Sequence, residues 1–154
     1  MSYTITLTNR IDQGTDTSFK CLLPTPIKIN RNSYVQLQNA YLEKQNVPQI
    51  LGGIYVVIPQ FASGNSFWLN QDNNYTSGMI GCIQNFPNLV PSGTNDDKLI
   101  LPSTFPKIAL NNSDMMLQNL DVELRDRSNA IINPSIINNV SITITITDNP
   151  VLLS

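Results

Sequence analysis

The chain has 154 residues, of which 41% are hydrophobic, 13% are charged and none is histidine, and its formal net charge is −2. The length fits one domain, residues 1–154, with a sizeable core. The weak negative charge excludes the basic stripe that nucleic-acid binding requires, so we expect no nucleic acid as partner. Without histidine the chain lacks the commonest general base and metal ligand, which disfavours an enzyme.

The N-terminal segment predicts a half-buried strand, because Tyr3, Ile5 and Leu7 alternate with threonines. The same segment has no basic region followed by an apolar region, and no apolar run reaches the roughly 18 residues of a membrane span. We therefore expect no signal peptide, synthesis in the cytoplasm and no membrane insertion.

Strand patterns continue to the other end of the chain. In chain order they are Tyr3–Thr8, Phe19–Leu22, Ile27 with Ile29, Tyr34–Lys44 (with Val35, Leu37 and Tyr41 on one side), Gly53–Gln60, Ser66–Asn70, Met79–Gln84, Lys98–Leu101, Lys107–Leu110, Met116–Arg125 and Val140–Thr147. The last is the cleanest, with isoleucines on one face and hydroxyl side chains on the other. Segment Asn85–Asp97 reads as a loop, and Ser113–Gln118 allows a short helix as an alternative to a strand.

Eight to ten short strands in one domain of this size predict an all-β sandwich or barrel. The best fit is an eight-stranded jelly roll of two packed four-stranded antiparallel sheets. An immunoglobulin-like sandwich is the alternative. It fits less well because Trp68 lies nearer Cys82 than Cys21.

The two cysteines carry little chemistry in this pattern. Cys21 and Cys82 are far apart and have no histidine or second cysteine nearby, so they do not form a zinc site, and we expect buried thiols that act as small hydrophobes. A disulfide is an alternative only outside a reducing compartment.

Candidate acid–base and cation sites each have a simpler explanation. Asp121 and Glu123 project from one face of a predicted strand about 7 Å apart, the range of glycosidase pairs. However, Arg125 and Arg127 follow, which favours a charge-balanced, solvated sheet face. Asp96–Asp97 and Asp72–Asn74 lack a full calcium loop and are expected to be polar turns. Nucleophilic triads and glycine-rich phosphate loops are absent, so we expect no catalytic residue, metal or cofactor.

One local pattern permits a sharper hypothesis. An exposed Trp beside amide and carboxylate side chains holds a sugar by stacking on the ring and bonding the hydroxyls. In this reading the carbohydrate site consists of Trp68, Asn70, Asp72, Asn74 and Tyr75. The competing interpretation is a core aromatic that leads into a polar loop.

Three stretches carry a resemblance to a known family. The opening strand is followed by Phe19-Lys20-Cys21-Leu22-Leu23-Pro24-Thr25-Pro26-Ile27-Lys28-Ile29 and then by Tyr34-Val35-Gln36-Leu37-Gln38-Asn39-Ala40-Tyr41-Leu42. Near the other end, Leu120–Ile132 reads as an aliphatic strand, a polar turn and a second aliphatic segment. This order resembles the single jelly-roll minor capsid (penton) proteins of the adenovirus–tectivirus lineage, as found in virophages, polinton-like viruses and giant viruses.

The resemblance implies a structural protein of the virion. In that family a single jelly roll forms a homopentamer at the fivefold vertex and contacts the major capsid protein. A minor cement protein inside the same capsid is an alternative role, and a carbohydrate-binding β-sandwich is an alternative of another class. The short termini outside the first and last strands imply a bare vertex module, without a spike or membrane anchor.

Overall fold

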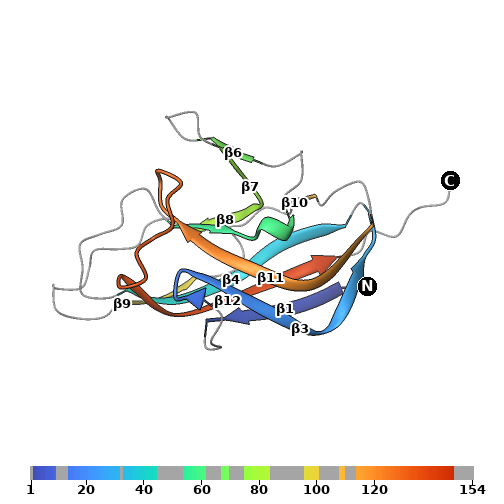
Figure 1. Ribbon diagram of the computed structural model, residues 1–154, viewed down its shortest axis with the longest axis horizontal. Coiled ribbons are helices and arrows are strands. Elements are labelled where there is room, and N and C mark those ends of the chain that lie inside the picture. The colour runs from blue at the N-terminus through green and yellow to red at the C-terminus, as the bar shows by residue number, and fades with distance from the viewer. Residues whose placement is uncertain are drawn as a thin grey trace.

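A computed structural model of the chain describes residues 2–9, 14–31, 33–44, 54–61, 67–69, 75–83, 96–100, 108–109 and 114–147. The strands are β1 (Ser2–Thr8), β2 (Gly14–Thr15), β3 (Ser18–Ile29), β4 (Tyr34–Lys44), β5 (Ile54–Val57), β6 (Phe67–Leu69), β7 (Tyr75–Ser77), β8 (Met79–Ile83), β9 (Asp96–Ile100), β10 (Ile108–Ala109), β11 (Met115–Arg125) and β12 (Ile137–Thr147) (Figure 1). The one helical element among these residues is a 3-10 turn, Pro59–Phe61, so no described helix could cross a membrane.

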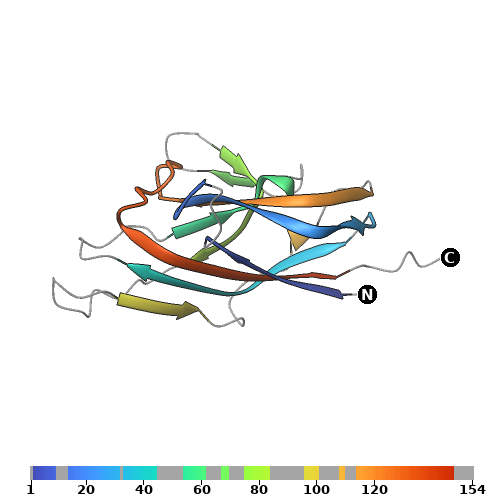
Figure 2. The same ribbon diagram turned by 60° about the horizontal axis from the view of Figure 1, so that its bottom comes forward.

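Two antiparallel sheets form the sandwich. Sheet A has the order β1-β12-β4, with β9 and β10 pairing at different points along the outer side of β4, and sheet B has the order β2-β3-β11-β5-β8. Figure 2 shows them as two stacked layers, with β3 and β11 above β12, β1 and β4. The prediction of an all-β domain of two packed antiparallel sheets is therefore confirmed.

The strand order is that of a jelly roll. If β9 and β10 share one edge position and the two-residue β2 is left aside, the eight main strands alternate between the sheets except at β5 and β8, which pair with each other in sheet B. The first strand lies beside the last. This order differs from the immunoglobulin order, in which one sheet carries the first, second, fifth and fourth strands. Each sheet gains one strand over the predicted four, because β2 adds to one edge and the β9/β10 position is split.

The core lies between the sheets and is almost entirely aliphatic. Its fully buried members include Leu7, Ile29, Leu37, Leu42, Ile54, Ile58, Phe61, Ile80, Ile83, Leu120 and Leu124. The predicted alternation on β11 and β12 is confirmed, since Leu120, Val122 and Leu124 are buried while Asp121 and Glu123 face outward.

Two bulges shift the phase of this alternation. On β12, Asn139 has a positive φ of 47° and lies where the pairing with β4 shifts, so that Ile137 and Val140 both face the core. On β4, Thr143 pairs with Asn39 and Ile144 with Leu37, which leaves Gln38 as an extra residue. The prediction that Tyr41 shares a side with Val35 and Leu37 is therefore wrong.

Strand β3 is longer than the sequence pattern predicts. It runs through Pro24 and Pro26, where the sequence pattern predicts a break between two short strands. The pairing with β11 jumps from Leu22↔Asn119 to Ile27↔Leu117, so the residues between lie outside the ladder at the sheet edge. Proline is tolerated there because no ladder hydrogen bond needs its missing N–H.

Two segments that were expected to be helix or loop are strands in the structure. Residues 115–118 belong to β11, so the helical alternative at Ser113–Gln118 is wrong for them, since Met115 and Leu117 pack inward as strand residues. Asp96 and Asp97 begin β9 and pair with β4, so they lie in a strand rather than in the predicted loop. Residues 85–95 and 72–74 lie outside the described residues.

A buried hydroxyl connects the loops at one end of the sandwich. Thr17 is fully buried, and its Oγ1 donates a hydrogen bond of 2.6 Å to the backbone oxygen of Ile132. The backbone oxygen of Thr17 accepts a bond of 2.8 Å from the N–H of Leu124. This residue therefore fixes the turn before β3 against the connection between β11 and β12.

The alternation predicts a large difference between the two faces of β12. We expect Ile144→Ala, which deletes a fully buried side chain, to lower the free energy of unfolding by about 2–5 kcal/mol. The control Thr145→Ala alters the next residue, on the outer face, and should cost less than about 1 kcal/mol. Urea unfolding of both variants measures this, and equal losses would contradict the assigned phase.

Candidate functional site

Asp121, the first of the candidate acid–base pair, is held by one amide side chain. Gln60, in the 3-10 turn after β5, donates from Nε2 to Asp121 Oδ2 at 2.7 Å, and its Oε1 accepts from the backbone N–H of Asp121 at 2.9 Å. The two residues are 61 positions apart in the chain, so no local sequence pattern predicts this contact. The carboxylate is therefore positioned as a structural acceptor.

Glu123, the second of the pair, is neutralised on the same face of β11. Both Nε and Nη2 of Arg125 donate to Glu123 Oε2, at 2.9 and 2.6 Å. Nη1 of Arg125 donates to the backbone oxygen of Asn129 at 2.7 Å, which connects the strand to the following turn. In this turn Asp126 Oδ1 accepts from the N–H and Oγ of Ser128 and from the N–H of Ala130.

These contacts favour the charge-balanced sheet face over an acid–base pair. Each carboxylate of the row has a protein partner, and the described residues contain no group of three or more Cys, Asp or Glu that could hold a metal ion. The row extends into a turn whose backbone it orders, so its chemistry here is structural.

The candidate carbohydrate residues are described only in part. Trp68 lies on β6 and Tyr75 on β7, and these two strands form a separate two-stranded hairpin. They are not directly opposite each other, because Trp68 pairs with Thr76 and Leu69 with Tyr75. Asn70, Asp72 and Asn74 lie outside the described residues, so the site remains a prediction.

A polar surface covers the outer face of sheet A over β1, β12 and the part of β4 up to Tyr41, where the structure describes the side chains; we call it the hydroxyl face. It is formed by Ser2, Thr4, Thr6 and Thr8 on β1, by Ser141, Thr143, Thr145 and Thr147 on β12, and by Tyr34, Gln36, Asn39 and Tyr41 on β4. None of these side chains is charged at neutral pH, although about a quarter of residues in soluble proteins are. The Oγ1 atoms of Thr6 and Thr143 lie 3.1 Å apart, and Gln38 donates to Gln36 at 3.2 Å.

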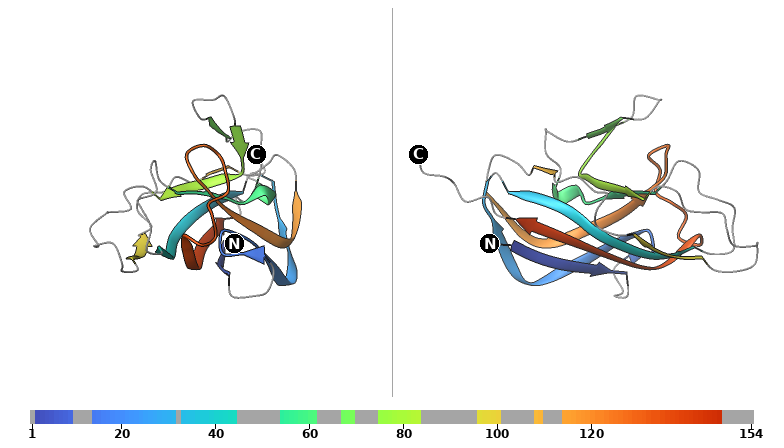
Figure 3. Two further views of the ribbon diagram at one scale, coloured as in Figure 1. Left: turned by 60° about the vertical axis from the view of Figure 1, so that its left-hand side comes forward. Right: turned by 180° about the vertical axis from the view of Figure 1, so that it is seen from behind.

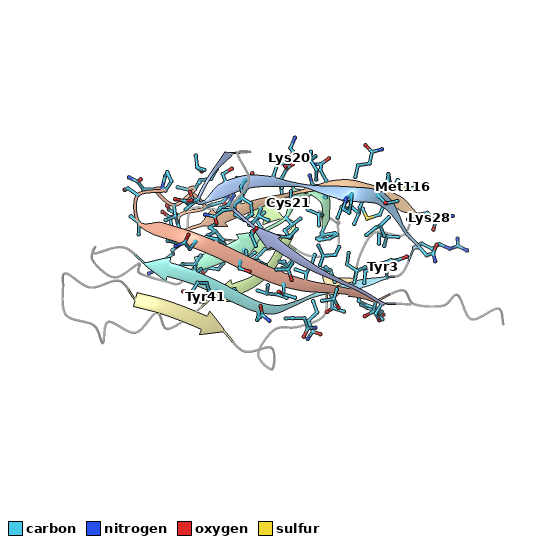
Figure 4. All side chains as sticks on the ribbon, turned by 90° about the horizontal axis from the view of Figure 1, so that it is seen from below. Tyr3, Lys20, Cys21, Lys28, Tyr41 and Met116 are labelled. Atoms are coloured by element: carbon cyan, nitrogen blue, oxygen red, sulfur yellow. The ribbon has the colours of Figure 1, made fainter. Side chains whose placement is uncertain are left out.

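The opposite outer face, on sheet B, has a different character. Leu22 on β3 and Met116 on β11 are large apolar side chains with 68% and 59% exposure. Exposed Lys20 and Lys28 lie on the same strand as Leu22, and Lys28 is 3.8 Å from Asp114. Figure 4 shows Lys20, Met116 and Lys28 on one side of the sandwich and Tyr41 on the other.

Neither cysteine forms a disulfide, and both are half-buried rather than fully buried as expected. They lie on β3 and β8, at opposite sides of sheet B with β11 and β5 between them. Three strand spacings amount to about 14 Å, well beyond the roughly 7 Å between Cα atoms that a disulfide allows. A disulfide between them within this fold is therefore excluded.

Burial changes the acidity of two groups on this sheet. Burial raises the pKa of the Cys21 thiol, a backbone interaction with Thr8 opposes the rise, and the charge of Asp121 adds to it. Burial also raises the pKa of the Tyr55 phenol, and its neighbour Cys82 adds to that rise. Neither group is shifted toward the reactive, ionised form that a nucleophile needs.

Comparisons with known proteins add little to this geometry. No protein-family model matches the chain, and no curated protein sequence matches it. A match by structure is the 2.6 Å structure of infectious bursal virus derived T=1 particles, with 10% sequence identity and a TM-score of 0.35. The match covers 96% of this chain and 32% of that chain. A likeness at this TM-score does not establish a shared function.

The raised pKa of Cys21 predicts that its thiol reacts slowly with alkylating reagents. In a Cys82→Ser variant, which keeps only Cys21, we expect alkylation by iodoacetamide at pH 8 to be several-fold slower in the folded than in the urea-unfolded chain. The neutral thiol stabilises the fold below the ordinary thiol pKa, and this contribution is lost as the pH rises through the higher folded pKa. Equal rates in the folded and unfolded chain would contradict the shift.

Proposed function

We propose that this chain is a structural subunit of a viral capsid, and more specifically a penton protein that assembles as a homopentamer. The observation that carries the proposal is the jelly-roll strand order, with the first strand beside the last, in a chain whose sequence resembles penton proteins at its opening and closing segments. Jelly rolls occur in viral capsid proteins, lectin domains and cupins, so the surfaces have to favour one of these.

The surfaces favour contact with other subunits. The centres of protein interfaces are depleted in Lys, Glu, Asp and Ser and enriched in Tyr. The hydroxyl face has two tyrosines and no charged residue, which fits this composition, whereas its two serines do not. The carboxylates of β11 serve local structure, and we propose that the chain is not an enzyme.

A closed ring requires two different surfaces on each subunit, because the contacts of a cyclic oligomer with more than two members are heterologous. The hydroxyl face and the outer face of sheet B, with exposed Leu22 and Met116, are two such surfaces on opposite sides of the sandwich. In this proposal the first packs against the second of the neighbouring copy. The remaining loops and edges are available to the major capsid protein, and the protein acts in the virion.

The mass in solution tests the pentamer. We expect light scattering to give five times the 17.1 kDa of one chain at high protein concentration. Thr143→Arg in the hydroxyl face and Met116→Arg on sheet B should each reduce the mass to that of a smaller species, because each places a charge in the ring contact. Ala130→Arg, in the exposed turn after β11, is the matched control and should leave the pentamer intact. A monomeric native chain at millimolar concentration would contradict the proposal.

A minor cement protein beneath the shell is the alternative within the virion. It would share the fold and differ in place, so a map of the virion distinguishes the two roles. Density for this chain at the fivefold vertex supports the penton, and density on the inner surface away from the vertex supports the cement role.

Carbohydrate binding is the second candidate, and the β6–β7 hairpin favours it because it brings the strand of Trp68 beside the strand of Tyr75. If a sugar stacks on this Trp, the intrinsic fluorescence should shift on titration with a glycan panel, since Trp68 is the one tryptophan of the chain. Trp68→Phe should remove this signal while Tyr3→Phe keeps it. No change at millimolar sugar would exclude this function.

A further inference from the structure

The open edge of β1 is the feature of this fold that the proposed ring does not use. Strand β1 is an edge strand of sheet A, and no other described strand pairs with its outer side. It shares this side of the sandwich with β3, which forms the edge of sheet B beyond the two residues that pair with β2 (Figure 3). An unpaired edge presents N–H and C=O groups that can pair with another chain.

The hydrogen-bonding phase of β1 identifies which backbone groups point outward. Asn9 donates from its N–H to the Val140 oxygen at 3.2 Å, and the N–H of Val140 donates back to Asn9 Oδ1 at 3.1 Å, so the backbone groups of these two residues face each other. Because such pairs alternate along an antiparallel ladder, Leu7, Ile5 and Tyr3 bond to β12, while Thr8, Thr6 and Thr4 direct their backbone groups away from it.

Two contacts agree with this phase. The outward oxygen of Thr8 accepts the bond from the Cys21 thiol at 3.5 Å. Thr6 and Thr143 are opposite each other, and their hydroxyls meet at 3.1 Å, as expected of the closer, non-hydrogen-bonded type of pair.

The other described edges carry protection against pairing, and β1 does not. Strand β3 has two prolines and exposed Lys20 and Lys28, and β8, β9 and β10 are no longer than five residues. Strand β1 has seven residues, a continuous register with β12, no proline and no charge. Short strands, prolines and lysines are the usual means of blocking an edge, so their absence on β1 points to a partner.

Partly exposed apolar side chains lie along this edge. Tyr3 and Ile5 of β1 and Leu23 and Ile27 of β3 pack against the core yet remain partly exposed. An incoming strand that alternates apolar and hydroxyl side chains would cover the apolar residues and extend the hydroxyl face. The sequence of β1 itself has this alternation.

We propose that β1 pairs antiparallel with β1 of a second copy of this chain, about a two-fold axis at Ile5. Two opposing residues can exchange hydrogen bonds only if both direct their backbone groups outward. Among the registers that meet this condition, the one with Thr4 opposite the partner's Thr6 pairs all seven residues of the strand. It places Tyr3 opposite the partner's Leu7 on the inner face and hydroxyls opposite hydroxyls on the outer face. Neither strand carries charge, so the copies meet without repulsion.

The size of the contact sets its strength. A seven-residue strand on a two-layer sandwich offers a side of about 23 Å by about 20 Å, or roughly 450 Å² per copy. A standard stable interface buries about 800 Å² per partner, so this dimer belongs to the weak, concentration-dependent class. The contact does not rest on the capsid role, because it leaves both outer faces free and joins two copies whether or not those faces form a ring.

Sedimentation over a concentration series tests the pairing. Thr6→Pro deletes one outward N–H and keeps the ladder to β12, and we expect it to raise the dissociation constant of the doubling step ten-fold or more. Thr6→Val keeps the N–H at the same position and should associate like the native chain. Equal association of the Pro and Val variants would overturn the proposal, whereas loss of the ring alone would leave it standing.

A cross-link tests the register without relying on a proline. Under mild oxidation, a mixture of Thr4→Cys and Thr6→Cys chains should form a disulfide-linked dimer at least ten-fold faster than either variant alone, because residues 4 and 6 are opposite only across the axis. Equal rates in the mixture and in the separate variants would overturn the two-fold register at Ile5.

Discussion

The packing of this sandwich depends on strand β12, which must keep its aliphatic side chains in phase with two neighbours at once. Its isoleucines and Val140 are buried, while β1 pairs along one side and β4 along the other. A slip of one residue in either register would move every aliphatic side chain to solvent. The bulges at Asn139 and Gln38 absorb the irregularities of both strands, and they preserve the common inner face.

The same constraint determines the outer surface. When the aliphatic residues of three strands face inward, their Ser, Thr, Gln, Asn and Tyr neighbours must face outward together, which produces the uncharged hydroxyl face. The charged residues of β11 are used differently, since Gln60, Arg125 and the turn after β11 engage them. The hydroxyl face shares the lack of Lys, Glu and Asp with the centres of protein interfaces, although serine is depleted there as well.

The sequence predicts the parts of the fold that obey a strict period of two. The boundaries of β4 and the inward residues of β11 follow from alternation, and the packing of two antiparallel sheets follows from the number of strands. The bulges are not predictable in this way, and for this reason strict alternation assigns Tyr41 to the wrong face of β4. That Pro24 and Pro26 can lie within a strand depends on that strand being at the edge of the sheet, which the sequence does not reveal. The Gln60–Asp121 contact depends on tertiary structure alone, because the two residues come from distant segments.

Backbone amide exchange at low and high protein concentration most directly tests the central proposal that this chain binds copies of itself through the hydroxyl face and the open edge of β1. We predict that concentrating the native chain slows exchange at the outward amides of Thr4 and Thr6, and along β4 and β12 of the hydroxyl face. Exchange in the turn at residues 126–130 should not change. Identical exchange at both concentrations throughout sheet A would contradict the proposal.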